Sequence, residues 1–427
     1  MANTYTYKVT FAKQYQEQLF RQPVYRALSR EAIVQGLYQG QTISRSYLSR
    51  FAVGELSAAG GYTVQSFTST AEVLTIDHKP YGAFRIVEWQ KFLDDLDTQE
   101  EAATFCMNDI FNYTDGLILQ AIVNGAGSSI DNRAFGGTTA DEGITVSLTN
   151  ARAISAFAQG NLIAQNAFTG RFSATKRFSG IKQRDGGDRM PVLVMPYFWW
   201  TQLILALSAR WTPQGDKVTT NGFMDMIDSF NIFVSNNLPW KGVYDVSASN
   251  LSNGDTLTFG GLTFTGVTGT PTNAGDFKIE AAAADTATNL KNAINSPYTS
   301  ISGKSVAFTQ ASLDSAVQTM LALTVATASG TAVTIKVAGN SVVIATTTSS
   351  TGSWTKKVCY AIAGTSQMVD VAIAKDVFVG EPIPVPGTIS KDIVPHSLLG
   401  FKVYHDQSPR IVSIVLDTSA VTVAPAY

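Results

Sequence analysis

The side chains that could carry chemistry are few and scattered along this chain. The three histidines, His78, His396 and His405, lie in separate segments, without the H-x-x-x-H or cysteine–histidine spacing of a metal site. The two cysteines, Cys106 and Cys359, are far apart and form no C-x-x-C pair. The sequence therefore predicts no metal site, no disulfide framework and no cofactor, and these residues are interpreted as structural.

Two short motifs imitate functional sites. Gly303–Ser305 (GKS) has the residues that end a phosphate-binding P-loop, but Tyr298 stands where that motif requires its first glycine. Asp185 and Asp188, in the turn RDGGDR, could offer two carboxylates to a cation, although such turns are more often plain loops. Because no G-x-S-x-G elbow or G-x-G-x-x-G is present either, we expect a protein without enzymatic activity.

Composition sets the class of protein. The chain has 427 residues, enough for two or three domains, and is 45% hydrophobic with a net charge of −2. That charge does not indicate a nucleic-acid binder. Charged residues make up only 15%, below the usual ~25%, which suits either a subunit that buries much surface against neighbours or a surface rich in Thr and Ser. No signal peptide or membrane span is predicted, so we expect a protein made in a cytoplasm.

Residues 1–50 are locally basic, unlike the chain as a whole. The positive side chains are Lys8, Lys13, Arg21, Arg26, Arg30, Arg45 and Arg50, against two glutamates. Apolar residues between positions 11 and 20 predict a short amphipathic helix that Pro23 interrupts. The segment is either an arm lying on neighbouring chains or on nucleic acid, where Lys and Arg offset phosphate charge, or a solvated terminal helix.

An extended segment follows and leads to a long helix. From 51 to 87 the chain is rich in strand-forming residues, and Gly60 and Gly61 mark the tip of a long hairpin that carries Tyr62 and Phe67. From Thr98 to Gly125, apolar residues recur at helical spacing over about 40 Å. The acidic residues just before and after Thr98 suit a capping box and the helix dipole better than a metal site.

Four strings, in this order, resemble parts of the tailed-phage major capsid proteins of the HK97 fold. They are LTIDHKPYGAFRIVEWQKFLDDLDTQEEA (74–102), MPVLVMPYFWWTQLILAL (190–207), IDSFNIFVSNNLPW (227–240) and the closing strands within 356–417. In that family the first string leads from an extended loop into a long spine helix. The second is a strand, a proline and a helix, and the third is a strand and a turn.

The resemblance implies an α+β, HK97-like fold and a structural function. The expected parts are an N-terminal arm (1–50), an extended loop (51–97), a spine helix with peripheral and axial domains (98–240), and return strands (354–427). The implied function is self-assembly into hexamers and pentamers of an icosahedral phage head around double-stranded DNA, in the virion and in the host bacterial cytoplasm during assembly. Intersubunit contacts are expected at Arg21, Arg26, Arg30, Gly60, Gly61, Tyr62 and Phe67.

The resemblance also implies partners. They are further copies of the chain, a separate scaffolding protein or none, a portal and packaged DNA, without a membrane; whether cement proteins take part is left open by the sequence. Some relatives begin with a removable scaffolding segment, but the loop here starts near residue 50, so no such segment and no trimming are expected. Lys79 lies near the loop, but nothing marks it as reactive, so the cross-linking seen in some relatives is not carried over.

Residues 241–353 interrupt this pattern with a stretch rich in Thr, Ser, Gly and Ala. Two hairpins are predicted, one through Gly260-Gly261 and one pairing 333–337 with 342–344 through Gly339-Asn340. Between them DTATNLKNAI (285–294) predicts a helix capped by Asp285 or Thr286. We interpret this as a small β-rich domain inserted at a turn of the core, where loop closure costs little. By analogy it is an accessory domain of the shell.

Two other functions stay open on the sequence alone. A tail or fibre protein could use the β-rich segment to bind a host glycan, although that leaves the long helix unexplained. A hydrolase with a carbohydrate-binding module is disfavoured because no acid–base pair is present. Closed particles of megadalton mass would support a capsid protein, whereas a stable monomer or trimer would contradict it.

Overall fold

The computed structural model describes residues 23–33, 40–48, 68–87, 98–165, 191–208, 226–227, 230–246, 251–339, 352–379 and 382–419, with a few single positions between 55 and 66. Three predictions fall outside this part of the chain. They concern the amphipathic helix at 11–20, the capping side chains around the start of the long helix, and the turn RDGGDR.

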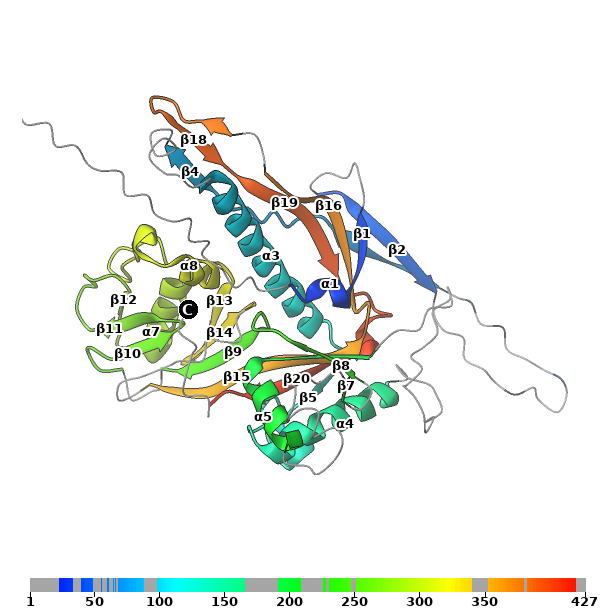
Figure 1. The fold of residues 1–427 in the computed structure, drawn as a ribbon. Helices are drawn as coiled ribbons and strands as arrows, with labels where there is room; N and C mark the ends of the chain where they lie inside the picture. The colour runs from blue at the N-terminus through cyan, green and yellow to red at the C-terminus, as the bar shows by residue number, and fades with distance from the viewer. Residues whose placement is uncertain are drawn as a thin grey trace, which may run out of the picture.

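A mixed sheet forms the centre of the molecule (Figure 1). Within the described residues its nine strands are β13 (Thr324–Ser329), β14 (Ala332–Val337), β9 (Trp240–Asp245), β15 (Ser353–Thr365), β6 (Pro191–Met195), β8 (Phe230–Val234), β7 (Met226–Ile227), β20 (Ile411–Asp417) and β5 (Ser128–Ile130). The long strand β15 organises them. One of its edges pairs with β20, and the other pairs first with β9 and then with β6.

Helices α4 (Leu148–Ala164) and α5 (Tyr197–Ser208) pack on each other beside this sheet. The predicted strand, proline and helix are confirmed as β6, Pro196 and α5, and all five residues of β6 are buried. The predicted strand before the turn is confirmed as β8, in which Phe230 is buried and Val234 is 41% exposed.

The long helix is confirmed as α3 (Thr98–Asn124), which ends one residue before the predicted Gly125. It crosses between the central sheet and a second sheet of order β1–β16–β19 (Figure 1). That sheet contains β1 (Ser29–Ile33), β16 (Val369–Val379) and β19 (Pro395–Lys402). Strand β1 runs parallel to β16 directly after the short helix α1 (Tyr25–Leu28).

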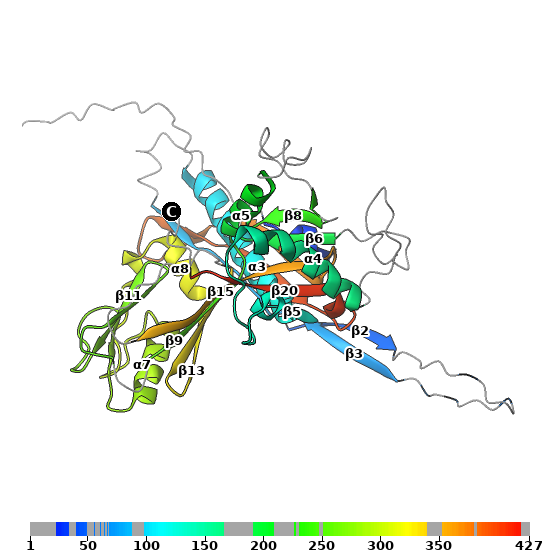
Figure 2. The same ribbon diagram turned by 90° about the horizontal axis from the view of Figure 1, so that it is seen from below.

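A two-stranded hairpin projects from the body of the molecule (Figure 2). It consists of β2 (Thr42–Leu48) and β3 (Ser69–Thr75), paired from Thr42 with Thr75 to Leu48 with Ser69. Its outgoing strand therefore lies before residue 51, where the loop was expected to begin. The alternating sequence TISRSYL was counted with the basic arm because of its arginine. A smaller sheet, at the other end of α3 from the hairpin in Figure 1, joins β17 (Ile383–Pro384), β18 (Ser390–Ile393) and β4 (Phe84–Val87).

Residues 251–339 form a small module on β9 and β15. Its elements are β10 (Thr256–Phe259), β11 (Leu262–Val267), β12 (Asp276–Lys278), α7 (Ala283–Asn295), α8 (Ser315–Ala322), β13 and β14. The hairpin through Gly260-Gly261 is confirmed, and the Phe259 and Phe264 rings stack at 5.5 Å. Helix α7 packs against β12, β13 and β14, and its Leu290 and Ile294 are buried.

Two details of the predicted module are wrong. Strand β14 pairs with β13 on one edge and β9 on the other, so no edge is left for a hairpin with 342–344. The hairpin turn is instead at Gly330-Thr331. Helix α7 begins at Ala283, with Ala282 as an N-cap that has no side-chain hydrogen bond, because a run of alanines extends the helix backwards. The Thr286 hydroxyl instead accepts a hydrogen bond from the backbone N–H of Glu280 at 2.9 Å.

One hydrophobic core is shared by the central sheet, α3 and the module. Its members include Ile118 of α3, Trp240 of β9, Leu290 of α7 and Ile362 of β15, all buried. Because the module's sheet and core continue those of the rest of the chain, the module is fixed in place by packing as well as by its two covalent connections.

Three short 3₁₀ helices complete the described elements. They are η1 (Asn132–Phe135), η2 (Gln310–Ser312) and η3 (Ser408–Arg410).

Candidate functional site

The middle of α3 is the point where several parts of the chain meet. Asp115 is fully buried, and one of its carboxylate oxygens accepts hydrogen bonds from the backbone N–H groups of Val24 (3.0 Å) and Tyr25 (2.8 Å). The other oxygen accepts from the Asn237 side-chain amide at 2.9 Å, in the turn between β8 and β9. Asp115 therefore holds together α1, α3 and the turn that leads into the module.

These hydrogen bonds have a structural reason. The first N–H groups of a helix have no partner within the helix, and Val24, the N-cap of α1, has no capping side chain of its own. Asp115 provides that cap from another element. Burial raises the pKa of Asp115 to about 6, while its three hydrogen-bond donors act in the opposite direction.

The next residue of α3, Gly116, touches the far end of the module. A Cβ placed on Gly116 would lie 2.6 Å from the Cα of Gly339, which has a positive φ of 79°. The two backbones are thus in direct contact at glycines. Asn237, in the turn before β9, contacts Asp115, and Gly339, just after β14, contacts Gly116. Neighbouring residues of α3 thus position both ends of the module.

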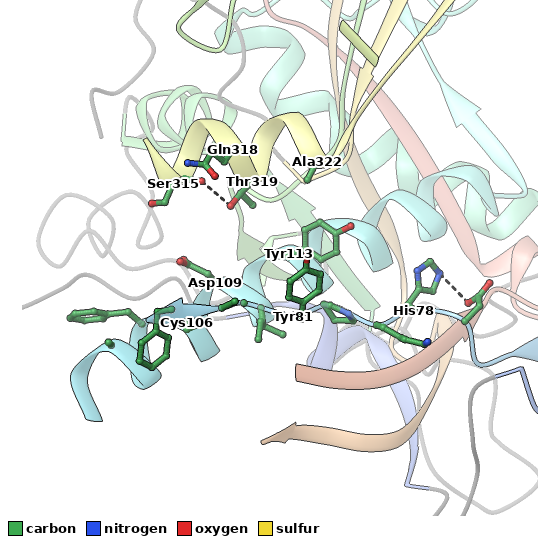
Figure 3. A pocket seen from close by; sticks show the side chains of 18 residues that line it. His78, Tyr81, Cys106, Asp109, Tyr113, Ser315, Gln318, Thr319 and Ala322 are labelled. Carbon is green, nitrogen blue, oxygen red and sulfur yellow. Dashed lines mark hydrogen bonds and ion pairs between the residues drawn. The ribbon is translucent and has the colours of Figure 1, made fainter. Parts of the chain in front are cut away.

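A groove of about 690 Å³ lies nearer the N-terminal end of α3, between the body and the module. Figure 3 shows α8, with Gln318 and Thr319, on one side, and Cys106, Asp109 and Tyr113 of α3 on the other. The segment Asp77–Phe84, which follows β3, forms the rest of the wall. Tyr81 in this segment is 71% exposed. The groove is a seam between the module and the body.

The side chains of the groove offer weak means for catalysis. Burial raises the pKa of the Cys106 thiol, aided by the negative charge of Asp109, which disfavours the reactive thiolate. Burial also raises the pKa of Tyr113. The imidazole of His78 stacks on Phe401 at 4.4 Å, as expected of a structural histidine.

Charged side chains fasten the hairpin to the second sheet. Arg45 of β2 bonds Asp406 at 2.9 Å and Asp370 at 3.5 Å. From β19, the Lys402 ammonium donates to the carbonyl of Val73 at 2.9 Å. The base of the hairpin is therefore anchored, while Val64 and Val73 remain 80% and 43% exposed.

The residues predicted for intersubunit contact are only partly described. Arg26 is exposed on α1, with its guanidinium 5.2 Å from the Phe111 ring centre of α3, and Arg30 is exposed on β1. Gly60 has a φ of 75° and no atom near its Cβ position, as suits a tip. Arg21, Gly61, Tyr62 and Phe67 lie outside the described residues. The intersubunit role of all seven stays a prediction.

Sequence reasoning missed the residues at the middle of α3. A signal existed, because Asp115 and Gly116 stand together in the interior of the predicted helix, immediately before the largely apolar stretch 117–123. Neither aspartate nor glycine favours a helix interior. In the sequence Gly303–Ser305, which imitates the end of a P-loop, the lysine has a structural partner: the Lys304 ammonium forms an ion pair with Glu280 at 2.6 Å. Among the described residues no group of three possible metal ligands occurs.

Comparison with known proteins identifies the fold. No family model matches the sequence, and no curated protein matches it. A solved structure from Mycobacterium phage Che8 matches with a TM-score of 0.51 and 11% identity, over 97% of this chain and 98% of that one. The chain has the HK97-like fold.

Two further solved structures are less similar. The head of Helicobacter pylori bacteriophage KHP40 matches with a TM-score of 0.48 and 9% identity, over 96% of this chain and 95% of that one. The acidic stable capsid of Helicobacter pylori bacteriophage KHP30 matches with a TM-score of 0.48 and 12% identity, over the same shares.

The long helix α3 and the hairpin β2–β3 are the elements for which the roles of spine helix and extended loop were expected, and that assignment stays a prediction. In the part of the chain that the structure describes, no helix is long and apolar enough to cross a membrane.

Proposed function

We propose that this chain is the major capsid protein of a tailed phage, which assembles into hexamers and pentamers of an icosahedral head around double-stranded DNA. The observation that carries the proposal is the HK97-like fold over 97% of the chain. The low fraction of charged residues supports it, because a shell subunit buries much of its surface against its neighbours.

The projecting hairpin supports self-association. Val64 is 80% exposed and Val73 is 43% exposed, while the base of the hairpin is held by Arg45. An anchored hairpin with exposed apolar side chains is suited to lie across a second copy, because burying those side chains there is favourable. The expected contacts at Arg21, Arg26, Arg30, Gly60, Gly61, Tyr62 and Phe67 belong to this proposal.

The remaining parts of the proposal follow from a head protein. The subunits assemble in the host bacterial cytoplasm and end in the virion, with a separate scaffolding protein, a portal and cement proteins as partners. The chain has no enzymatic step of its own. The module within residues 241–353 is an accessory that decorates or braces the shell, on a core formed by 98–240 and 354–427.

The hairpin register allows a clean test. Leu48 pairs with Ser69, so replacing 49–68 by Asn-Gly closes the hairpin with a two-residue turn. Asp245 likewise pairs with Ser353, so replacing 246–352 by Asn-Gly removes the module and keeps the pairing of β9 with β15. Both variants retain a closed two-residue hairpin, but removal of the module also opens the shared hydrophobic core, so each variant is compared with the other only after circular dichroism shows that it is folded.

Electron microscopy and sedimentation of the expressed protein measure the outcome. We expect the full chain, with scaffolding protein where it is required, to form closed particles of megadalton mass. We expect the hairpin variant to remain as soluble subunits, and the module variant to form shells still. A full chain that stays a monomer or trimer under all these conditions would overturn the proposed function.

A further inference from the structure

Three lysines lie together on one face of the central sheet. Lys336 of β14 and Lys241 of β9 are directly opposite each other in the antiparallel pair. Lys356 of β15 is opposite Val243, two residues from Lys241 and therefore on the same face. These three residues, called the lysine cluster below, bring three positive charges onto adjacent strands.

This arrangement is unfavourable without an anion. Like charges directly opposite in a sheet repel each other. Burial lowers the pKa of Lys241, and Lys336 and Lys356 lower it further, whereas Asp141 raises it. Within the described residues no carboxylate lies within ion-pair distance of any of the three ammonium groups. Lys356 donates instead to the carbonyl of Ala140 at 3.1 Å.

A cavity lies beside the cluster. Its volume is about 190 Å³, and it is bounded by Lys241, Lys336, the C-terminal end of α3 and Ser413 of β20. The other polar side chains of its wall are Gln120, Asn124, Ser129, Asp141 and Tyr360. All of these except Asp141 can donate a hydrogen bond. The cavity therefore offers many donors, excess positive charge and a single carboxylate.

The chemistry of the wall selects the ligand. A cation would meet two ammonium groups and one carboxylate, which disfavours it. A phosphate group has several acceptor oxygens and a full negative charge, and lysine binds it as a point charge without requiring the planar geometry of arginine. Binding would also relieve the repulsion between Lys241 and Lys336.

We propose that the lysine cluster and the cavity beside it form a binding site for a phosphate group. The site stands on this geometry and does not require assembly. If the chain is a capsid protein, the natural source of the phosphate is the backbone of the packaged DNA, and only that part rests on the proposed function.

The test compares two double variants of equal charge. Lys241→Gln/Lys336→Gln removes two members of the cluster, and Lys291→Gln/Lys375→Gln removes two lysines elsewhere, on α7 and β16. Binding of a fluorescent 12-base-pair duplex to unassembled subunits is measured by anisotropy over a series of KCl concentrations. The thermal midpoint is measured in inorganic phosphate and in KCl at equal ionic strength.

The logarithm of the DNA-binding constant falls linearly with the logarithm of the salt concentration. We expect this slope to be less steep by about two in the cluster variant, because each lysine that contacts a phosphate contributes about one. The control variant should keep the slope of the wild type. Phosphate should raise the midpoint of the wild type and the control, but not of the cluster variant. A phosphate effect lost only in the cluster variant, with unchanged DNA binding, supports the site with free phosphate as its source.

Equal DNA slopes and equal phosphate effects in the wild type and the cluster variant would overturn the proposal. Lys336 is exposed, so Lys336→Gln alone should fold and still lower the slope by about one, which covers a failure of the double variant to fold. Particle formation is scored separately by microscopy. A failure of the phosphate site is therefore distinct from a failure of the proposed function.

Discussion

The buried carboxylate of Asp115 makes a prediction that can be worked out from its contacts. Asp115→Ala leaves the N–H groups of Val24 and Tyr25 and the amide of Asn237 without this acceptor. An unsatisfied buried donor costs about 1–3 kcal/mol. We expect the free energy of opening α1 to fall by about 3 kcal/mol, so that the amides of residues 24 and 25 exchange with solvent roughly a hundredfold faster.

Asp115→Asn should behave differently. Its carbonyl oxygen still accepts from Val24 and Tyr25, and rotation of the Asn237 amide restores the third hydrogen bond. We expect amide exchange within about threefold of the wild type. Asp109→Ala is the matched control, because this aspartate is exposed on the same helix and should leave the exchange at residues 24 and 25 unchanged.

The same residue gives a pH dependence. The pKa of Asp115 is about 6 in the folded chain, above the ordinary value of 3.8, so the folded chain takes up the proton more readily than the unfolded chain. The stability from this group is therefore greatest below pH 4 and falls as pH rises through 6. Between pH 5 and 7 the wild type should lose about 1 kcal/mol relative to Asp115→Asn.

Hydrogen exchange followed by mass spectrometry, from pH 5 to 7 and corrected for the intrinsic rate, measures both effects. Unchanged exchange at residues 24 and 25 in Asp115→Ala would refute the capping role. Parallel pH profiles of the wild type and Asp115→Asn would refute the raised pKa, and so would a wild type that gains stability relative to Asp115→Asn as pH rises. Taking the difference in stability between the two proteins at each pH removes the contributions of the other carboxylates, some of which change stability in the opposite direction.

Three further predictions concern packing. Gly116→Ala should destabilise the subunit by about 1–3 kcal/mol because its Cβ meets backbone, whereas Gly160→Ala, with open space at its Cβ, should stabilise it by up to about 1 kcal/mol. Thermal midpoints that move the same way for both would contradict the contact. Thr286→Val, which loses the hydroxyl under the start of α7, should cost about 1 kcal/mol in denaturant unfolding. Cys359 is fully buried and should resist a maleimide in the native protein, whereas half-buried Cys106 should react slowly. Mass spectrometry measures the order of labelling, and faster labelling of Cys359 would contradict its burial.

The parts of the fold that could be predicted are those with strong local signals. The helical spacing over 98–125, the sequence PVLVMP before YFWW, and Gly260-Gly261 between two apolar pairs each specify their element within a few residues. The second hairpin was mispredicted because Gly339-Asn340 looks like a turn, whereas β14 has both edges occupied by β13 and β9. Pairing between strands ninety residues apart has no local signal.

The candidate site was harder to predict for the same reason. The hydrogen bonds of Asp115 join residues 91 and 122 positions away, and the lysine cluster joins three strands that are brought together only by the sheet. Apart from the unusual pair Asp115 and Gly116 inside a helix, each of these residues alone is ordinary. Their meaning comes from register and burial, which a single sequence does not express.

The way in which the module is attached has a mechanical consequence. The chain enters it through β9 and leaves it through β15, and these two strands are paired with each other from Trp240 with Cys359 to Asp245 with Ser353. Beyond that pair, β15 continues into the core, where Val358–Gly364 pair with β20. A pull on the module along the strands would act on β9 and β15 from the same end, and it would load the hydrogen bonds between β15 and β20 in shear. Tension applied to the module is therefore transmitted directly into the central sheet.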